Sequence, residues 1–102
     1  MTHPTSLEAF ADCEEHFNRA LAAERGIVIE CETEGQANRL RQRLNTYRVR
    51  IRTLNTKVYP EDHPMHGKSQ WDHLICRIPK ESPNEVVIDK QALVAAVKVR
   101  EL

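Results

Sequence analysis

The feature that most constrains the fold is a run of apolar residues at alternating intervals of three and four in the middle of the chain. Such intervals place side chains in one stripe along an α-helix. Thr33 and Gln36, just before the run, have the spacing of a helix-capping box. We therefore predict an amphipathic helix over about residues 34–52, with an apolar stripe formed by Ala37, Leu40, Leu44, Tyr47, Ile51 and Leu54.

The segment YRVRIRT, residues 47–53, also supports a second interpretation. Its apolar residues alternate with arginines, which is the pattern of a half-buried β-strand. We prefer the helix, because the three-and-four spacing covers more residues. A break in this helix near Asn45 and Thr46 stays open.

Regular patterns flank this helix on both sides. Thr5 and Glu8 have capping-box spacing ahead of apolar residues, so we predict a first helix over about residues 5–25 that follows a flexible stretch, residues 1–4. Asp89 can cap a final helix that contains Leu93, Ala96 and Val97. The period-two pattern of β-strands appears in GIVIECE from Gly26, in WDHLICRI over residues 71–78 and in EVVID over residues 85–89.

These elements predict an α+β fold in a single small domain, residues 1–102. The expected order is helix, strand, helix, strand, strand, helix, with a three-stranded sheet and the helices packed on one of its faces. Residues 55–70 carry Pro60, Pro64 and Gly67 and show no period, so we predict a long loop there. No apolar run approaches the roughly 20 residues that span a bilayer, which predicts a protein without a membrane segment.

The three cysteines point to a reducing compartment. Cys13, Cys31 and Cys76 are widely spaced and form no CxxC pair, and no secretory leader precedes them. Both observations favour free thiols and a cytoplasmic location.

Charge is distributed unevenly along a chain whose formal net charge is zero. Residues 1–34 carry eight carboxylates and two arginines, a net charge of −6, whereas residues 35–57 carry seven basic residues and no acidic one. The remainder has a net charge of −1. Such asymmetry indicates either an acidic partner or an acidic and a basic element that pack on each other.

Both explanations apply to the arginines of the middle helix. They fall on the two rims of the apolar stripe, where guanidinium groups can bind phosphate or pair with the protein's own carboxylates. For the internal alternative, the helical wheel places Glu14 within reach of Arg39 or Arg43 if the first two helices pack together. The residues that we predict to bind nucleic acid are Arg39, Arg41, Arg43, Arg48, Arg50, Arg52, Lys57 and Lys68.

The predicted loop is a candidate recognition segment. Trp71 at its end can stack on a base, although a tryptophan in the core is more common. The residues that we expect to contact a partner there are His63, His66, Gln70 and Trp71. The histidines and nearby carboxylates do not specify the four ligands of a metal site, so we predict no metal and no cofactor. Motifs of hydrolases, nucleotide-binding loops and metalloproteases are missing from the sequence, which argues against an enzyme.

Residues 26–79 support a resemblance. A short strand, a helix with RLRQRL and further arginines, a loop and the strand WDHLICRIP resemble small α/β proteins that are encoded by bacteriophages and prophages. The resemblance implies a cytoplasmic accessory protein in infected bacteria. It further implies that the protein binds nucleic acid or blocks a host complex, for example a defence system.

The leading hypothesis is a non-enzymatic protein that binds DNA or RNA through its arginine-rich helix. The first alternative is a protein-interaction module that binds and inhibits a host complex. The second is a homodimer, built through the heptad-like stripe of the middle helix.

Overall fold

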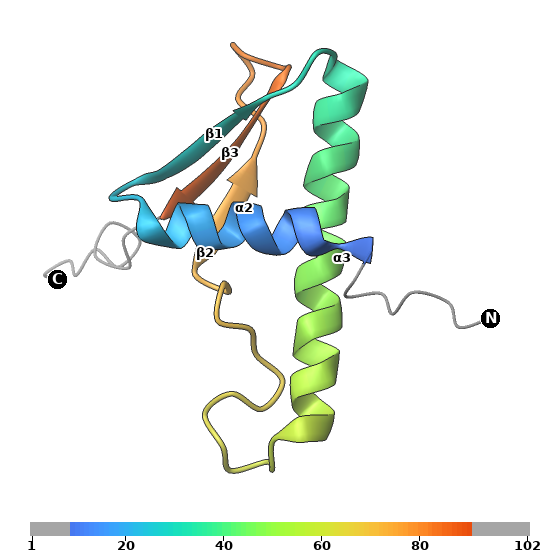
Figure 1. Ribbon diagram of the computed structural model, residues 1–102, viewed down its shortest axis with the longest axis vertical. Helices are drawn as coiled ribbons and strands as arrows, with labels where there is room; N and C mark the ends of the chain where they lie inside the picture. Colours follow the sequence, from blue (N-terminus) through green and yellow to red (C-terminus); the bar gives the residue numbers. More distant parts are fainter. Residues whose placement is uncertain (1–8, 91–102) are drawn as a thin grey trace, which may run out of the picture.

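The computed structural model describes residues 9–90 of the chain. This part contains two helices, a three-stranded antiparallel sheet and the segments that connect them (Figure 1). The predicted α+β class and the order of these five elements are confirmed. The predicted final helix, the capping box at Thr5 and residues 1–4 lie outside the described residues. The elements are α2 (Ala11–Ala22), β1 (Gly26–Glu30), α3 (Glu34–Val58), β2 (Leu74–Arg77) and β3 (Glu85–Lys90).

The sheet has the order β1-β3-β2, with β3 antiparallel to both neighbours. Ile88 lies opposite Ile27 of β1 and Cys76 of β2, and Val86 lies opposite Ile29. Because side chains alternate along a strand, these residues share one face of the sheet. Val28 of β1 points to the other face and is 55% exposed.

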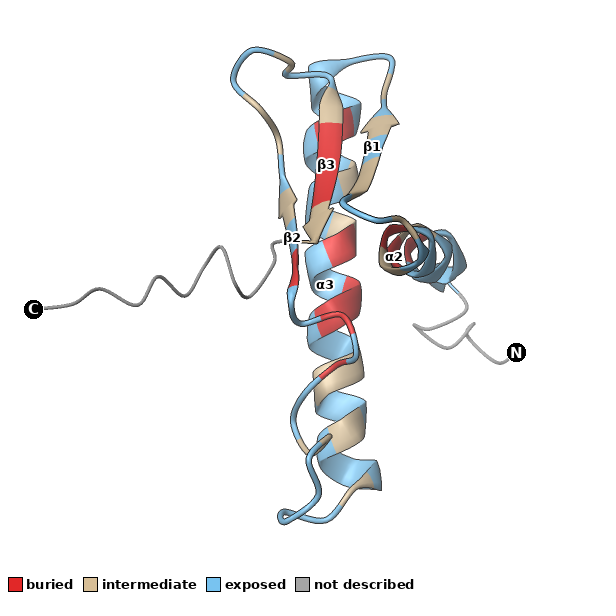
Figure 2. Cartoon of the chain, turned by 90° about the vertical axis from the view of Figure 1, so that its left-hand side faces the viewer, coloured by how far each residue is buried: buried red, intermediate tan, exposed pale blue. Residues whose placement is uncertain are grey.

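The core lies between this face of the sheet and both helices, as predicted. Phe17 of α2, Leu44 of α3 and Ile88 of β3 are fully buried in one cluster. Figure 2 shows the sheet in front of α3 with α2 beside it, and the buried residues of β3 and α3 at their contact. Four aromatic rings, with centroids 5.4 to 6.1 Å apart, join the helices to the segment before β2: Phe10, Phe17, Tyr47 and Trp71.

α3 begins where its capping residues predict. The Thr33 hydroxyl accepts a hydrogen bond from the Gln36 amide (3.1 Å), and the Gln36 side chain accepts one from the Glu32 amide (2.8 Å). The helix continues without a break through Asn45 and Thr46, so the strand interpretation of residues 47–53 is wrong. It ends at Val58 rather than near residue 52, because Pro60 excludes the residue before it from the helix.

Three other predicted elements are shorter in the structure, and one of them is β1, which ends at Glu30 and not at the end of GIVIECE. α2 ends at Ala22, three residues before the predicted end, and residues 23–25 lead into β1. β2 covers only Leu74–Arg77, since residues 71–73 form turns. One of these turns is closed by the Leu74 amide, which donates to the Trp71 carbonyl (3.0 Å).

Candidate nucleic-acid interface

The side of α3 that turns away from the core is a continuous exposed surface, which we call the outer face. The sequence has no acidic residue from Gly35 to Pro60, so the only carboxylate of α3 is Glu34, at the first position of the helix. Its residues are all exposed: Asn38, Arg39, Arg41, Gln42, Asn45, Thr46, Val49, Arg50, Thr53, Thr56 and Lys57.

Arg48, which we predicted to bind nucleic acid, lies in the core instead. It is only 9% exposed and its guanidinium donates to the carbonyl oxygens of Trp71 (2.9 Å) and Leu74 and to Asn45 Oδ1 (3.1 Å). The guanidinium also lies 5.4 Å from the centroid of the Phe17 ring. Carbonyl oxygens and an aromatic face thus compensate the buried charge. This arginine is a structural residue, and the prediction that it contacts nucleic acid is wrong.

Arg43 and Arg52 pair with the protein's own carboxylates. Arg43 Nη2 lies 2.6 Å from Asp12 Oδ1 and also donates to the Ala9 carbonyl (3.1 Å). The predicted packing of the acidic and basic helices is therefore confirmed, but the partner is Asp12 and not Glu14. The reason is that α2 buries Cys13 and Phe17, and this rotation of the helix places Asp12 beside Arg43.

Arg52 ties α3 to the following segment. Its Nε lies 2.8 Å from Asp72 Oδ1, and the same carboxylate accepts bonds from the Ser69 hydroxyl (2.6 Å) and amide (3.1 Å). Burial opposes the ionisation of Asp72, but the bonds from Ser69 and Arg52 outweigh it and lower the pKa of Asp72. Arg43 and Arg52 are thus engaged in the fold, although both keep part of their side chains in solvent.

The remaining cations of α3 stand in solvent. Among residues 9–90, no carboxylate lies within ion-pair distance of Arg39, Arg41, Arg50 or Lys57. The guanidinium of Arg50 lies over the Phe10 ring, 5.5 Å from the ring centroid, and has no carboxylate partner among these residues. Arg39, Arg50 and Lys57 are separated by eleven and seven residues, which correspond to about three and two helical turns, so they follow one edge of the outer face. Arg41 lies at the opposite edge.

Uncharged polar residues fill the space between these two edges, and the sequence interpretation missed them. Asn38, Gln42 and Thr46 lie one turn apart on the outer face. Within the described chain, the side chain of Gln42 makes no hydrogen bond, and Asn38 uses only its amide nitrogen, toward the Glu34 carbonyl (3.1 Å). A helical wheel would have found these residues between the two arginine rims.

The loop predicted over residues 55–70 lies at residues 59–73, because α3 continues to Val58. It folds back along α3 (Figure 1) and is held by hydrogen bonds within the loop and to α3. Asn55 Nδ2 donates to the Lys68 carbonyl (2.6 Å). His63 Nδ1 accepts from the Met65 amide (3.0 Å), and His66 Nδ1 lies 2.8 Å from the Tyr59 carbonyl oxygen. The predicted recognition histidines therefore bond to their own segment. His63, Lys68 and Gln70 are exposed, and His66 is half-buried.

Trp71 belongs to the core and is not available to a partner. It is 2% exposed, stacks on Phe17 with ring centroids 5.4 Å apart, and donates its indole N–H to Asn18 Oδ1 (3.2 Å). The prediction that Trp71 contacts a base or a partner is wrong. The rings of Phe17 and Tyr47 pack against Trp71, each with its centroid 5.4 Å away, and occupy the place that a stacked base would need.

The cysteines and histidines form no obvious reactive centre in the described range. Cys13 is fully buried, and this burial, aided by the nearby Asp12 charge, raises the pKa of its thiol to about 11. All three cysteines are free, and Cys76 also has a raised pKa because of burial. Among residues 9–90, no three His, Cys, Asp or Glu side chains come together as a metal ion would require.

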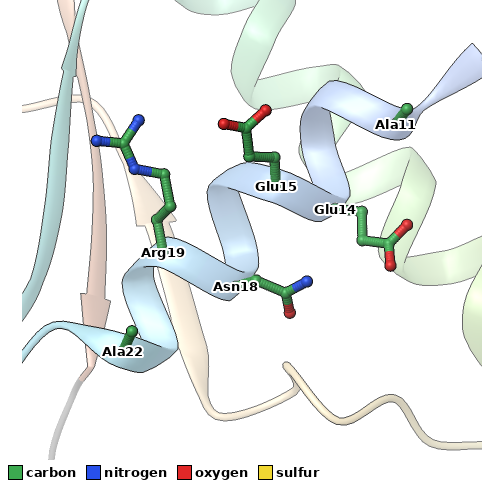
Figure 3. Close-up of a pocket in the computed structure, with 6 residues that line it drawn as sticks. All are labelled: Ala11, Glu14, Glu15, Asn18, Arg19 and Ala22. Carbon is green, nitrogen blue, oxygen red and sulfur yellow. The ribbon is translucent and has the colours of Figure 1, made fainter.

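A shallow hollow of about 430 Å³ lies along the exposed side of α2 (Figure 3). The side chains of Glu14, Glu15 and Arg19 point in different directions from the helix and do not converge on a common point. Such an arrangement does not position a ligand, because a binding site needs polar groups that converge. The outer face of α3 remains the best candidate site.

The chain matches no protein family, no curated protein and no solved structure. The resemblance to bacteriophage and prophage proteins therefore stays a prediction. No described helix combines the length and the apolar character that crossing a membrane demands.

Proposed function

We propose that the protein binds nucleic acid through the outer face of α3. The observation that carries this proposal is the set of four exposed cations, Arg39, Arg41, Arg50 and Lys57, which have no carboxylate partner in residues 9–90. α3 carries seven basic residues and only one acidic residue, Glu34, in a protein whose formal net charge is zero. Cations that are held in solvent along about 27 Å of helix suit a phosphate backbone.

The first test is a salt titration of binding to labelled oligonucleotides. Each phosphate that a cation neutralises releases counterions, so the logarithm of the association constant falls linearly with the logarithm of salt concentration. Four contacts on a duplex predict a slope of about −3 to −4. Fluorescence anisotropy with a duplex of about two helical turns measures it. No binding at low salt would overturn the proposal.

A matched pair of triple variants separates this surface from charge in general. Replacing Arg39, Arg41 and Arg50 by glutamine should lower affinity and reduce the slope by about 3. The control replaces Arg19, Arg25 and Lys80 by glutamine, which removes the same charge from exposed positions outside α3. An equal loss of affinity in both variants would contradict the assignment of nucleic-acid binding to the outer face. Thermal melting of both variants checks that they fold.

A protein contact is the second candidate function, and the free end of α3 favours it. Leu54 is 40% exposed and Val58 is 60% exposed, beyond the part of α3 that the sheet covers. Apolar residues in this position suit a second protein chain. Light scattering from micromolar to millimolar concentration tests a homodimer, and Leu54→Ser should abolish any association. A constant monomer mass excludes the homodimer.

A further inference from the structure

We infer that α3 binds double-stranded DNA in the major groove and reads base edges with Asn38, Gln42 and Thr46. This inference rests on the proposed function and narrows it to one nucleic acid and one mode of contact. It follows from the arrangement of the outer face, in which uncharged polar side chains lie between two edges that carry cations.

The uncharged strip has the chemistry that base reading requires. Asparagine and glutamine present a donor and an acceptor together, which matches the N6 and N7 positions of adenine in the major groove. The Gln42 amide makes no hydrogen bond in the described chain, and Asn38 Oδ1 accepts none. Both amides are exposed on consecutive turns of the helix, so they can contact neighbouring bases.

The cations are placed for the two phosphate backbones that border a groove. Arg39 and Arg50 follow one edge of the outer face, and Arg41 lies at the other. A helix with its side chains is about 10–12 Å wide, and the major groove of B-DNA is about 12 Å wide. With the helix in the groove, arginines at both edges meet phosphates of opposite strands while the central amides face the bases.

Among the described residues 9–90, the fold leaves this surface accessible. The sheet covers the opposite side of α3, and the second half of the helix extends past the end of the sheet (Figures 1 and 2). The carboxylates bonded to α3 arginines, Asp12 and Asp72, neutralise Arg43 and Arg52. Neither of those ion pairs involves an arginine of the outer face.

Other nucleic acids fit this surface less well. Proteins that bind single strands stack bases on exposed aromatic rings. Here Phe10, Phe17, Tyr47 and Trp71 are buried, and Tyr59 stacks on His63 with ring centroids 4.3 Å apart. Double-stranded RNA has a major groove that is too deep and narrow for side chains to read. The observations therefore favour duplex DNA.

The test starts with selection from a pool of duplexes with randomised sequence. A base-reading helix should enrich a short motif, and the enriched duplex should bind more tightly than a scrambled one of equal composition. Gln42→Ala should reduce this preference about ten- to hundredfold and leave binding to the scrambled duplex nearly unchanged. Gln70→Ala, which truncates an exposed glutamine outside α3, is the control and should change neither.

The possible results separate this inference from the proposed function. Binding to duplexes without an enriched motif overturns base reading but leaves nucleic-acid binding intact. Tighter binding to the single strand or to duplex RNA of the same sequence also overturns the inference alone. Absence of binding to every oligonucleotide at low salt overturns the proposed function itself. If Gln42→Ala and Gln70→Ala change the sequence preference equally, the assignment of base reading to Gln42 is wrong.

Discussion

At the scale of single residues, position on α3 decides what each arginine does. Arg48 and Arg41 are seven residues apart, about two turns of the same helix, yet one is buried and the other is exposed. The difference comes from the backbone at the start of β2, which brings the carbonyls of Trp71 and Leu74 against Arg48. A guanidinium can be buried only where enough acceptors surround it.

Arg48→Ala should therefore destabilise the protein by about 3 kcal/mol, because it leaves buried carbonyls without a donor and removes packing against Phe17. Arg41→Ala should change stability by less than about 0.5 kcal/mol, as is usual at exposed positions. Chemical denaturation of both variants measures the difference. Equal effects would contradict the structural role of Arg48.

Gly26 is a second residue whose role depends on one contact. Its φ of 106° lies in the region that favours glycine, and a Cβ there would lie 2.0 Å from the Ile88 carbonyl oxygen. Gly26→Ala should cost about 2–3 kcal/mol, because strand β3 must shift. Gly35→Ala is the control: its Cβ meets nothing closer than 3.5 Å, and alanine should stabilise the helix by about 0.5 kcal/mol. Thermal melting should show a lower melting temperature for Gly26→Ala and a higher one for Gly35→Ala.

At the scale of elements, the segment 59–73 determines how α3 is used. It covers one side of the helix and takes Arg48 and Arg52 out of the set available to a ligand. Its attachment depends on Asp72, which accepts bonds from Arg52 and Ser69. The segment thus sets one border of the outer face.

Asp72→Asn should lower stability at neutral pH by about 1–2 kcal/mol, since the side chain is partly in solvent and its bonds are correspondingly weaker. Because the folded pKa of Asp72 lies below 3.8, the stabilisation from its charge is complete above that value and is lost as the pH falls below it. The melting temperatures of wild type and variant should therefore converge in acid. Asp62→Asn, at an exposed position of the same segment, is the control. A difference in melting temperature between wild type and Asp72→Asn that stays constant with pH would contradict this account.

At the scale of the whole molecule, the zero net charge hides a separation of charge in space. α2 pairs with α3 through a single ion pair, Asp12 with Arg43, and the exposed Glu14 and Glu15 form no ion pair among residues 9–90. The acidic helix therefore does not neutralise the outer face of α3. A surface with one sign of charge attracts a polyanion even when the total charge is zero.

We expect the protein to be retained on immobilised heparin at pH 7 and low salt, although its formal net charge is zero at that pH. The variant with glutamine at positions 39, 41 and 50 should elute at clearly lower salt. The control variant with glutamine at positions 19, 25 and 80 should elute nearly with the wild type. Passage of the wild type through the column would show that the outer face does not act as an anion-binding surface.

The sequence alone determined the order of the five described elements and the start of α3, whereas the predicted end of this helix was about six residues too early. Local chemistry carries this information: Thr33 and Gln36 cap the helix, the three-and-four spacing buries Leu44 and Tyr47, and Pro60 stops it. The uncharged residues between the arginines were equally visible in the sequence. Their significance emerges only with the knowledge that this face is exposed.

The tertiary structure alone decided which arginines are free. The partners of Arg43, Arg48 and Arg52 lie 20 or more residues away along the chain. A helical wheel gives the direction of each side chain but not what the fold brings against it. Asp12 rather than Glu14 meets Arg43 because Cys13 and Phe17 set the rotation of α2. The choice between internal pairing and an external partner is therefore made residue by residue, through contacts that no local pattern encodes.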